Sequence, residues 1–172
     1  MNPADQTLVE AYQAGAAEVR QAVARLFDLD FTEAELDAHP EPGRWSIRQL
    51  VCHLADAELL YAERIKRILV EDEPLLVRAD PDKTVALAFA GRCVMDEVAL
   101  IESVRRHTGA ILATLTATQL ERQGMHSTDG RLTLRTVLER VTAHIPHHLR
   151  HLPTKQQAIL AARTPGEPGL SR

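Results

Sequence analysis

The amino-acid sequence predicts an all-α protein: a four-helix bundle with a long crossover connection and a few short extra helical turns. The composition is the first reason, because Ala, Leu, Glu and Arg are abundant and aromatic residues make up only 3% of the chain. Long unbranched side chains lose little rotamer freedom in a helix. Periodicity is the second reason, since four long segments repeat apolar residues at helical spacing and none shows a convincing strand pattern.

The first half of the chain predicts two long helices separated by a structured loop. Asn2 is a suitable N-cap for the first helix, whose apolar stripe extends to Phe27. A capping-box pattern at Thr32 predicts a short helical turn in the loop. A second capping box at Ser46 begins a helix that is expected to run to about Val70.

The second half of the chain predicts the crossover and two further helices. The segment "EDEPLLVRADPDKT", residues 71–84, contains two prolines and reads as a long connection. The third helix is expected from about Val85 to Leu115. A short helical turn and a polar loop should occupy residues 116–130, after which Thr133 can cap the last long helix.

Length and composition favour one domain over residues 1–160, followed by a flexible tail over residues 161–172. The formal net charge of -4 argues against nucleic acid as a partner, because such proteins usually carry a basic surplus. No apolar run approaches the roughly 20 residues that span a bilayer, and the N-terminus lacks the features of a signal peptide. The two cysteines, Cys52 and Cys93, are expected to be buried free thiols. We therefore expect a cytoplasmic protein without a membrane partner.

The sequence "HIPHHLRH", residues 144–151, holds four of the eight histidines. Residues four apart share one face of a helix, so two imidazoles at that spacing can bind one metal ion. The cluster offers two such pairs, His144 with His148 and His147 with His151. A third ligand should come from another helix.

His53 is the best third ligand by position, since it lies in the second helix, which should pack against the last one. The choice between the two pairs stays open on periodicity. The core stripe from Leu134 to Ile145 places His148 nearest its centre and favours the first pair. Pro146, however, can bend the helix, so the helical phase beyond it is unreliable.

Three features together resemble the DinB/YfiT-like superfamily of damage-inducible, metal-dependent proteins. Two lie in "RWSIRQLVCHLADAE", residues 44–58: the Trp-Ser helix opening and the "HLADAE" motif. The third is the H-x-x-H-H-x-x-H that ends "GMHSTDGRLTLRTVLERVTAHIPHHLRHL", residues 124–152. The resemblance covers about residues 40 to 155 and implies a four-helix bundle with a long crossover that forms a homodimer.

The resemblance also implies which histidines bind the metal. The family takes one ligand from the second helix and two from the last, and these match His53, His147 and His151 in this sequence. On that assignment His144 and His148 become flanking residues that pack against the site or hydrogen-bond to a ligand.

Two carboxylates follow His53 closely in the sequence. Asp56 and Glu58 are candidates to orient a ligand or to accept a proton.

Three protein nitrogens and one free position are typical of a catalytic metal centre, and both zinc and nickel suit imidazole ligands. Some superfamily members resemble transferases of low-molecular-weight thiols such as bacillithiol or mycothiol. The resemblance therefore implies an enzyme that joins a thiol to an electrophilic small molecule. The alternatives are a metal-dependent hydrolase that uses metal-bound water and a non-enzymatic metal-binding protein of the stress response.

Overall fold

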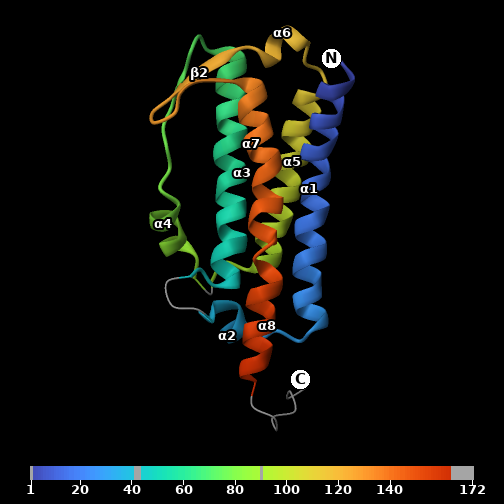
Figure 1. The fold of residues 1–172 in the computed structure, drawn as a ribbon, viewed down its shortest axis with the longest axis vertical. Coiled ribbons are helices and arrows are strands. Elements are labelled where there is room, and N and C mark those ends of the chain that lie inside the picture. Colours follow the sequence, from blue (N-terminus) through green and yellow to red (C-terminus); the bar gives the residue numbers. More distant parts are fainter. Residues whose placement is uncertain (1, 41–43, 90, 164–172) are drawn as a thin grey trace.

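The computed structural model describes residues 2–40, 44–89 and 91–163, and its four long helices form a bundle (Figure 1). The four are α1 (Pro3–Asp28), α3 (Ile47–Val70), α5 (Val94–Leu112) and α7 (Leu134–Leu149). Helices α1 and α3 lie diagonally opposite, and each packs against both α5 and α7. The predicted four-helix bundle is confirmed.

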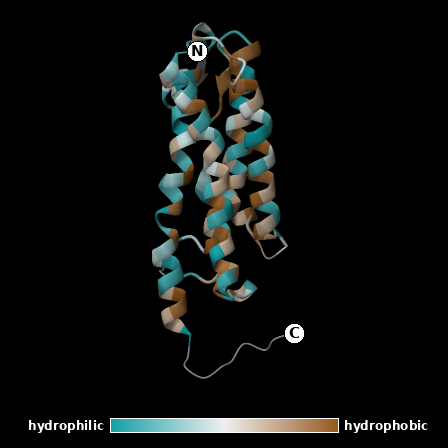
Figure 2. Cartoon of the chain, turned by 90° about the vertical axis from the view of Figure 1, so that its right-hand side faces the viewer, coloured by the Kyte–Doolittle hydropathy of each residue, from teal (hydrophilic) through white to brown (hydrophobic). Residues whose placement is uncertain are grey.

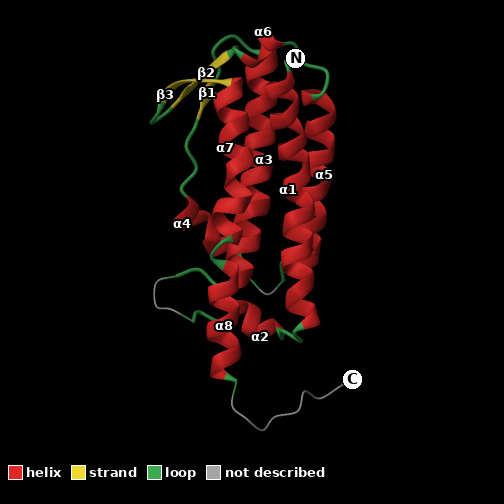
Figure 3. Cartoon of the chain, turned by 45° about the vertical axis from the view of Figure 1, so that its right-hand side comes forward, coloured by secondary structure: helices red, strands yellow, loops and turns green. Residues whose placement is uncertain are grey.

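Helices α3 and α5 run in the same direction, opposite to α1 and α7 (Figure 1). Two consecutive parallel helices require a connection that returns along the bundle, and this is the predicted crossover. It contains β1 (Leu75–Leu76), α4 (Pro81–Thr84) and the short 3₁₀ turn η1 (Val85–Leu87). Figure 3 shows α4 and the strands outside the bundle, beside α3 and α7.

The capping residues that the sequence predicts begin the helices in the structure. The Asn2 side chain accepts a hydrogen bond from the Asp5 amide, and the Thr133 hydroxyl accepts one from Thr136. Complete capping boxes form at Thr32 and Ser46, which begin α2 (Glu33–Asp37) and α3. A further capping box begins α6 (Ala117–Leu120). Local hydrogen-bonding chemistry thus determines most helix starts.

The third long helix starts later than the sequence predicts. Helix α5 begins at Val94 rather than about Val85, because the chain leaves η1 in an extended conformation at Ala88. Two apolar residues of the segment that was expected to be helical, Leu87 and Phe89, are exposed rather than packed in a core.

Three short strands also differ from the prediction that no strand would form. Strand β2 (Gln123–His126) pairs with β1 in parallel and with β3 (Gly130–Thr133) in antiparallel orientation. Strands of two to four residues are too short to show an alternating pattern. Gly124 lets β2 approach the bundle, because a Cβ there would lie 2.9 Å from a Leu76 methyl and 3.1 Å from Ile68.

The later start of α5 also changes the environment of one cysteine. Cys52 is a buried free thiol, as predicted, but Cys93 is exposed at the N-cap of α5. The predicted tail lies outside the described residues, except that α8 (Leu152–Ala162) includes its first two positions and residue 163 follows. Within the described part of the chain, no helix combines the length and apolar character that crossing a membrane requires.

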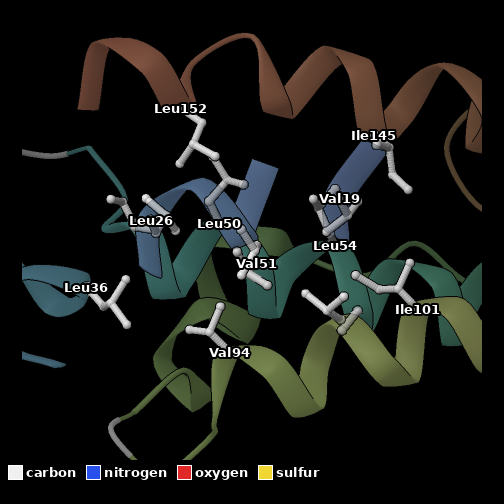
Figure 4. Close-up of a cluster of buried hydrophobic side chains, with 14 of the residues drawn as sticks. Val19, Leu26, Leu36, Leu50, Val51, Leu54, Val94, Ile101, Ile145 and Leu152 are labelled. Atoms are coloured by element: carbon white, nitrogen blue, oxygen red, sulfur yellow. The ribbon is translucent and has the colours of Figure 1, made fainter. Parts of the chain in front are cut away.

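Apolar side chains fill the space between the helices in two clusters. Figure 2 shows polar and apolar residues mixed along each long helix, as amphipathic packing requires. The cluster nearer α2, shown in Figure 4, joins side chains from all four long helices, such as Val19, Leu54, Ile101 and Ile145. The second cluster lies between the helices and the strands and includes Leu76.

A buried arginine links the four long helices between these clusters. Arg105 of α5 is 1% exposed, and its guanidinium donates 2.7 Å to a carboxylate oxygen of Glu58 on α3. It also donates to the backbone carbonyls of Tyr12 on α1 and Val141 on α7. Gly15 leaves room for it, because a Cβ there would collide with the guanidinium.

Replacing Arg105 with alanine is expected to lower the free energy of unfolding by about 3–5 kcal/mol, because Glu58 would remain buried without its cation. Urea denaturation measures this loss. The double variant Arg105→Met/Glu58→Leu should recover much of it, since both charges are then absent. The neighbouring exposed Arg106→Ala is the matched control, expected within about 0.5 kcal/mol of the wild type. Equal losses for Arg105→Ala and the control would refute the structural role.

Candidate metal centre

Three histidines from two antiparallel helices converge at one site. His53 of α3 faces His144 and His148 of α7, and one ring nitrogen of each lies within 4.8 Å of the others. The Nε2 atoms of His53 and His144 are 3.1 Å apart. All three side chains are half-buried.

The pair brought to His53 differs from the pair that the family resemblance implied. His147 and His151 are exposed and belong to no cluster of potential metal ligands among the described residues. His151 lies at the break between α7 and α8, where its Nε2 accepts a hydrogen bond from Arg150. The structure brings His53 together with His144 and His148, the pair favoured by periodicity, and the metal ligands themselves stay a prediction.

The physical reason is that Pro146 does not interrupt α7. The helix continues to Leu149, so the apolar phase that ends at Ile145 extends to the next turn. His148 therefore stays on the side that faces α3. His147 lies one residue earlier, about 100° around the helix, and points outward.

Burial keeps the histidines of the cluster neutral. Burial, together with a smaller effect of the neighbouring imidazoles, lowers the pKa of His144 to about 4 and that of His148 to about 3. Burial also lowers the pKa of His53, which Asp56 partly offsets. Neutral imidazole is the form that binds metal ions, so these rings are in the required protonation state at neutral pH.

The geometry and the chemistry of the three residues fit a divalent cation. Two nitrogens bound to one ion at roughly 2.0–2.1 Å in tetrahedral geometry lie about 3.3 Å apart, close to the 3.1 Å between His53 and His144. The other ring nitrogen of His144, Nδ1, is buried without a hydrogen-bond partner. Three imidazoles form a donor set suited to zinc or nickel.

Trp45 covers one side of the histidine cluster. Its ring stacks on His148 at 5.9 Å between centroids with planes 7° apart, and it lies 4.7 Å from the ring of His53. The Trp45 carbonyl accepts a hydrogen bond from Lys155 of α8. The Trp-Ser helix opening therefore supplies a wall of the site, a role that the sequence pattern did not reveal.

The two carboxylates near His53 have other partners. Both oxygens of Asp56 accept hydrogen bonds from Arg92, at 2.9 and 3.1 Å. Glu58 is fully buried and bonded to Arg105, and burial raises the pKa of Glu58. Asp56 lines the cavity beside the histidines, whereas Glu58 belongs to the link between the helices.

A cavity of about 610 Å³ opens beside the cluster and is lined by His53 and His144. The crossover and the strands form its outer wall, and α3 and α7 form its inner wall. Sequence reasoning missed most of its lining residues, among them Tyr61, Arg64 and His126. Arg64 follows His53 by eleven residues, about three helical turns, so helical spacing alone would have placed it on the same face.

Comparisons with known proteins place this fold and site in a family. The family model of the DinB superfamily matches residues 11–152. The chain belongs to the DinB superfamily. The solved structure of YfiT from Bacillus subtilis, described as a probable metal-dependent hydrolase with an unusual four-helix bundle topology, aligns with a TM-score of 0.80. That alignment has 26% identity and covers 91% of this chain and 88% of YfiT.

Two sequence relatives illustrate the range of similarity within the superfamily. YfiT of Bacillus subtilis strain 168 is 30% identical over 138 residues, 79% of this chain and 75% of YfiT. BH0277 of Halalkalibacterium halodurans is 28% identical over 148 residues, 85% of each chain. Both carry the name of candidate metal-dependent hydrolases.

The double variant His144→Gln/His148→Gln is expected to lose stoichiometric binding of Co²⁺ or Zn²⁺, because it removes two of three converging nitrogens. Visible absorption of the Co²⁺ complex and metal analysis of untagged protein measure this. The matched control His147→Gln/His151→Gln removes the exposed pair and should retain the metal. Loss of binding in the second variant alone would favour the pair implied by the family resemblance.

The free energy of unfolding of the metal-free protein is expected to fall as the pH is lowered from about 7 to about 4. His144 and His148 have pKa values near 6.5 when unfolded and about 4 and 3 when folded. The unfolded state therefore binds more protons in this range, and acid favours it. Urea midpoints across the range should give a shallower slope for His144→Gln/His148→Gln than for the wild type. A wild-type slope in the double variant would contradict the assignment.

Proposed function

We propose that this protein is a metal-dependent enzyme that transfers a low-molecular-weight thiol to an electrophilic small molecule. His53, His144 and His148 hold a divalent cation, zinc or nickel, beside the 610 Å³ cavity. A volume of this size is within the range of small-molecule sites. The homodimer implied by the family resemblance stays a prediction.

The state of the cavity's carboxylates favours thiol transfer over hydrolysis. Hydrolysis needs a group that takes a proton from water, and among the described lining residues the carboxylates are Asp56 and Asp129. Asp56 is held by Arg92 through both oxygens. Asp129 accepts hydrogen bonds from Arg140 at 2.5 Å and from Thr128 at 2.8 Å. A thiol is far more acidic than water and has less need of such a base.

In the proposed reaction the thiol sulfur attacks the electrophilic carbon. The new S–C bond forms as the bond between carbon and its leaving group breaks, and the thiol proton and the leaving group pass to solvent. A bound divalent cation would supply Lewis acidity, which lowers the pKa of a coordinated thiol. The three histidines position the reacting centre, and the rings of Trp45 and Tyr61 shield it from water.

Hydrolysis is the second candidate, favoured by the names of the relatives. YfiT and BH0277 are both named for metal-dependent hydrolysis. The same histidines would serve that reaction, with water in place of the thiol as the nucleophile.

The experiment compares the two reactions in one assay. Zn²⁺- and Ni²⁺-loaded protein is incubated with 1-chloro-2,4-dinitrobenzene and a panel of cysteine, glutathione, coenzyme A, bacillithiol and mycothiol. Formation of the thioether, followed by absorbance and mass spectrometry, should exceed that with metal-free protein for at least one thiol. The His144→Gln/His148→Gln variant should lose this excess, and His147→Gln/His151→Gln should keep it.

A different pattern would overturn the proposal. Metal-dependent cleavage of model esters and amides without any thiol, and no excess thioether with any thiol, would favour hydrolysis. Stoichiometric metal binding with neither activity would favour a metal-binding protein without catalysis.

A further inference from the structure

Arg64 of α3 carries a buried charge without a counterion. Its side chain is 7% exposed, and no carboxylate of the described residues forms an ion pair with it. One terminal nitrogen donates 2.6 Å to the carbonyl of Val77, and the guanidinium lies 5.5 Å from the centre of the Tyr61 ring. Its Nε is buried with no hydrogen-bond partner. Such a charge is costly unless something else neutralises it.

The other two deeply buried arginines are neutralised within the protein. Arg48 is bound by Glu33 and Asp37, and Arg105 is bound by Glu58. These two buried arginines are therefore each paired with a carboxylate. Arg64 is the exception among these three, and the exception lies in the wall of the cavity beside the histidines.

A second arginine adds to the positive charge at the same place. Arg140 of α7 lines the cavity too. The burial of Arg64 lowers the pKa of its guanidinium, and the positive charge of Arg140 lowers it further. Arg78 of the crossover is a third cation in the lining. The two carboxylates in the lining, Asp56 and Asp129, are already held by Arg92 and Arg140. The cavity wall thus has a cationic surplus, although the chain as a whole has a formal net charge of -4.

The cationic end of the cavity is separated from the histidines by a defined length of helix. Arg64 lies eleven residues after His53, which is about 16 Å along α3 on the same face. Arg140 lies four residues before His144, which is about 6 Å along α7. A molecule bound at both ends would therefore extend over roughly 6–16 Å, a length compatible with the cavity of about 610 Å³.

We propose that Arg64 and Arg140 bind an anionic group, a carboxylate or a phosphate, of the small molecule that reacts at the histidine cluster. This rests on the proposed function for the reaction, but not for the binding of the anion. Arginine suits the task because its planar fork of donors matches the oxygens of carboxylate and phosphate. Arg64 then acts as a residue that selects the substrate. Its Nε, which has no hydrogen-bond partner within the protein, is one of the donors that can bind the anion.

The test measures binding and stability in metal-free, full-length protein, so it requires neither catalysis nor metal. Isothermal titration at low ionic strength uses glutarate, glycerol phosphate and neutral glutaramide as probes. The wild type should bind at least one anion and not the amide. The variant Arg64→Met should weaken that binding about tenfold or more, because charge-assisted hydrogen bonds are lost. The control Lys66→Met removes the same charge from the exposed side of α3 and should bind as the wild type does.

The stability of the Arg64→Met variant shows whether Arg64 recognises a substrate or supports the fold. If the charge is kept for a ligand, Arg64→Met should unfold at higher urea concentration than the wild type, since methionine fills the site without an unpaired charge. A structural arginine would give the opposite result. Arg140→Gln, at a more exposed position, should also weaken anion binding and provides a second test should Arg64→Met not fold.

The outcomes distinguish this inference from the proposed function. Stronger binding of glycerol phosphate than of glutarate would identify a phosphate ligand, and the reverse would identify a carboxylate. Wild-type affinity in both arginine variants, or no anion binding up to millimolar concentrations, would overturn the inference even if thiol transfer is found. Anion binding that depends on Arg64 would support it even if the protein proves inactive.

Discussion

The contact between Arg105 and the other three long helices is the constraint on which the rest of the structure depends. It places Glu58 of α3 and Val141 of α7 at the same height in the bundle. Because the two helices are antiparallel, His53 then lies about 7.5 Å below that level, between His144 at about 4.5 Å and His148 at about 10.5 Å. This register therefore places His53 midway in height between His144 and His148, which lets the three rings converge. The Arg105–Glu58 contact is a buried ion pair. Such a pair contributes little net stability, and its main effect here is to fix the register of the helices.

The same register explains which part of the site could be predicted from the sequence. Capping residues, helical spacing and the apolar stripe of α7 predicted the long helices and placed His53 opposite the last helix. The stripe also favoured His144 and His148, and it did so correctly for the arrangement in the structure. The family resemblance moved the expectation to His147 and His151, which lie outside the cluster because α7 stays regular through Pro146 and then ends before α8. Local periodicity agrees with the arrangement of the rings in the structure, since the proline alters hydrogen bonding without shifting the helical phase.

The outer wall of the cavity could not be predicted in the same way. Its strands are two to four residues long, so their pairing depends on contacts between segments far apart in the sequence rather than on an alternating pattern. Gly124 is one example. It lets Leu76 and Ile68 approach the backbone of β2 closely, and no local sequence pattern reveals this contact. Arg64 has the same character: an arginine on an amphipathic helix is usually solvated, and only the crossover packed over α3 buries it. The start of α5 at Val94, after the extended residue Ala88, was likewise not predicted.

The two sides of α3 therefore carry buried charge in different ways. On the side facing α1 and α5, the buried carboxylate of Glu58 accepts hydrogen bonds from Arg105 and Tyr12. On the side facing the crossover, Arg64 has no carboxylate partner among the described residues, His144 has a buried nitrogen without a hydrogen bond, and burial lowers the pKa of the imidazoles. These departures from ordinary packing are costly, and the two at Arg64 and His144 lie around one cavity. Natural proteins retain such departures where binding or catalysis requires them. The position of Arg64 and His144 beside one cavity supports the proposed site on this side of α3, without reference to the family to which the chain belongs.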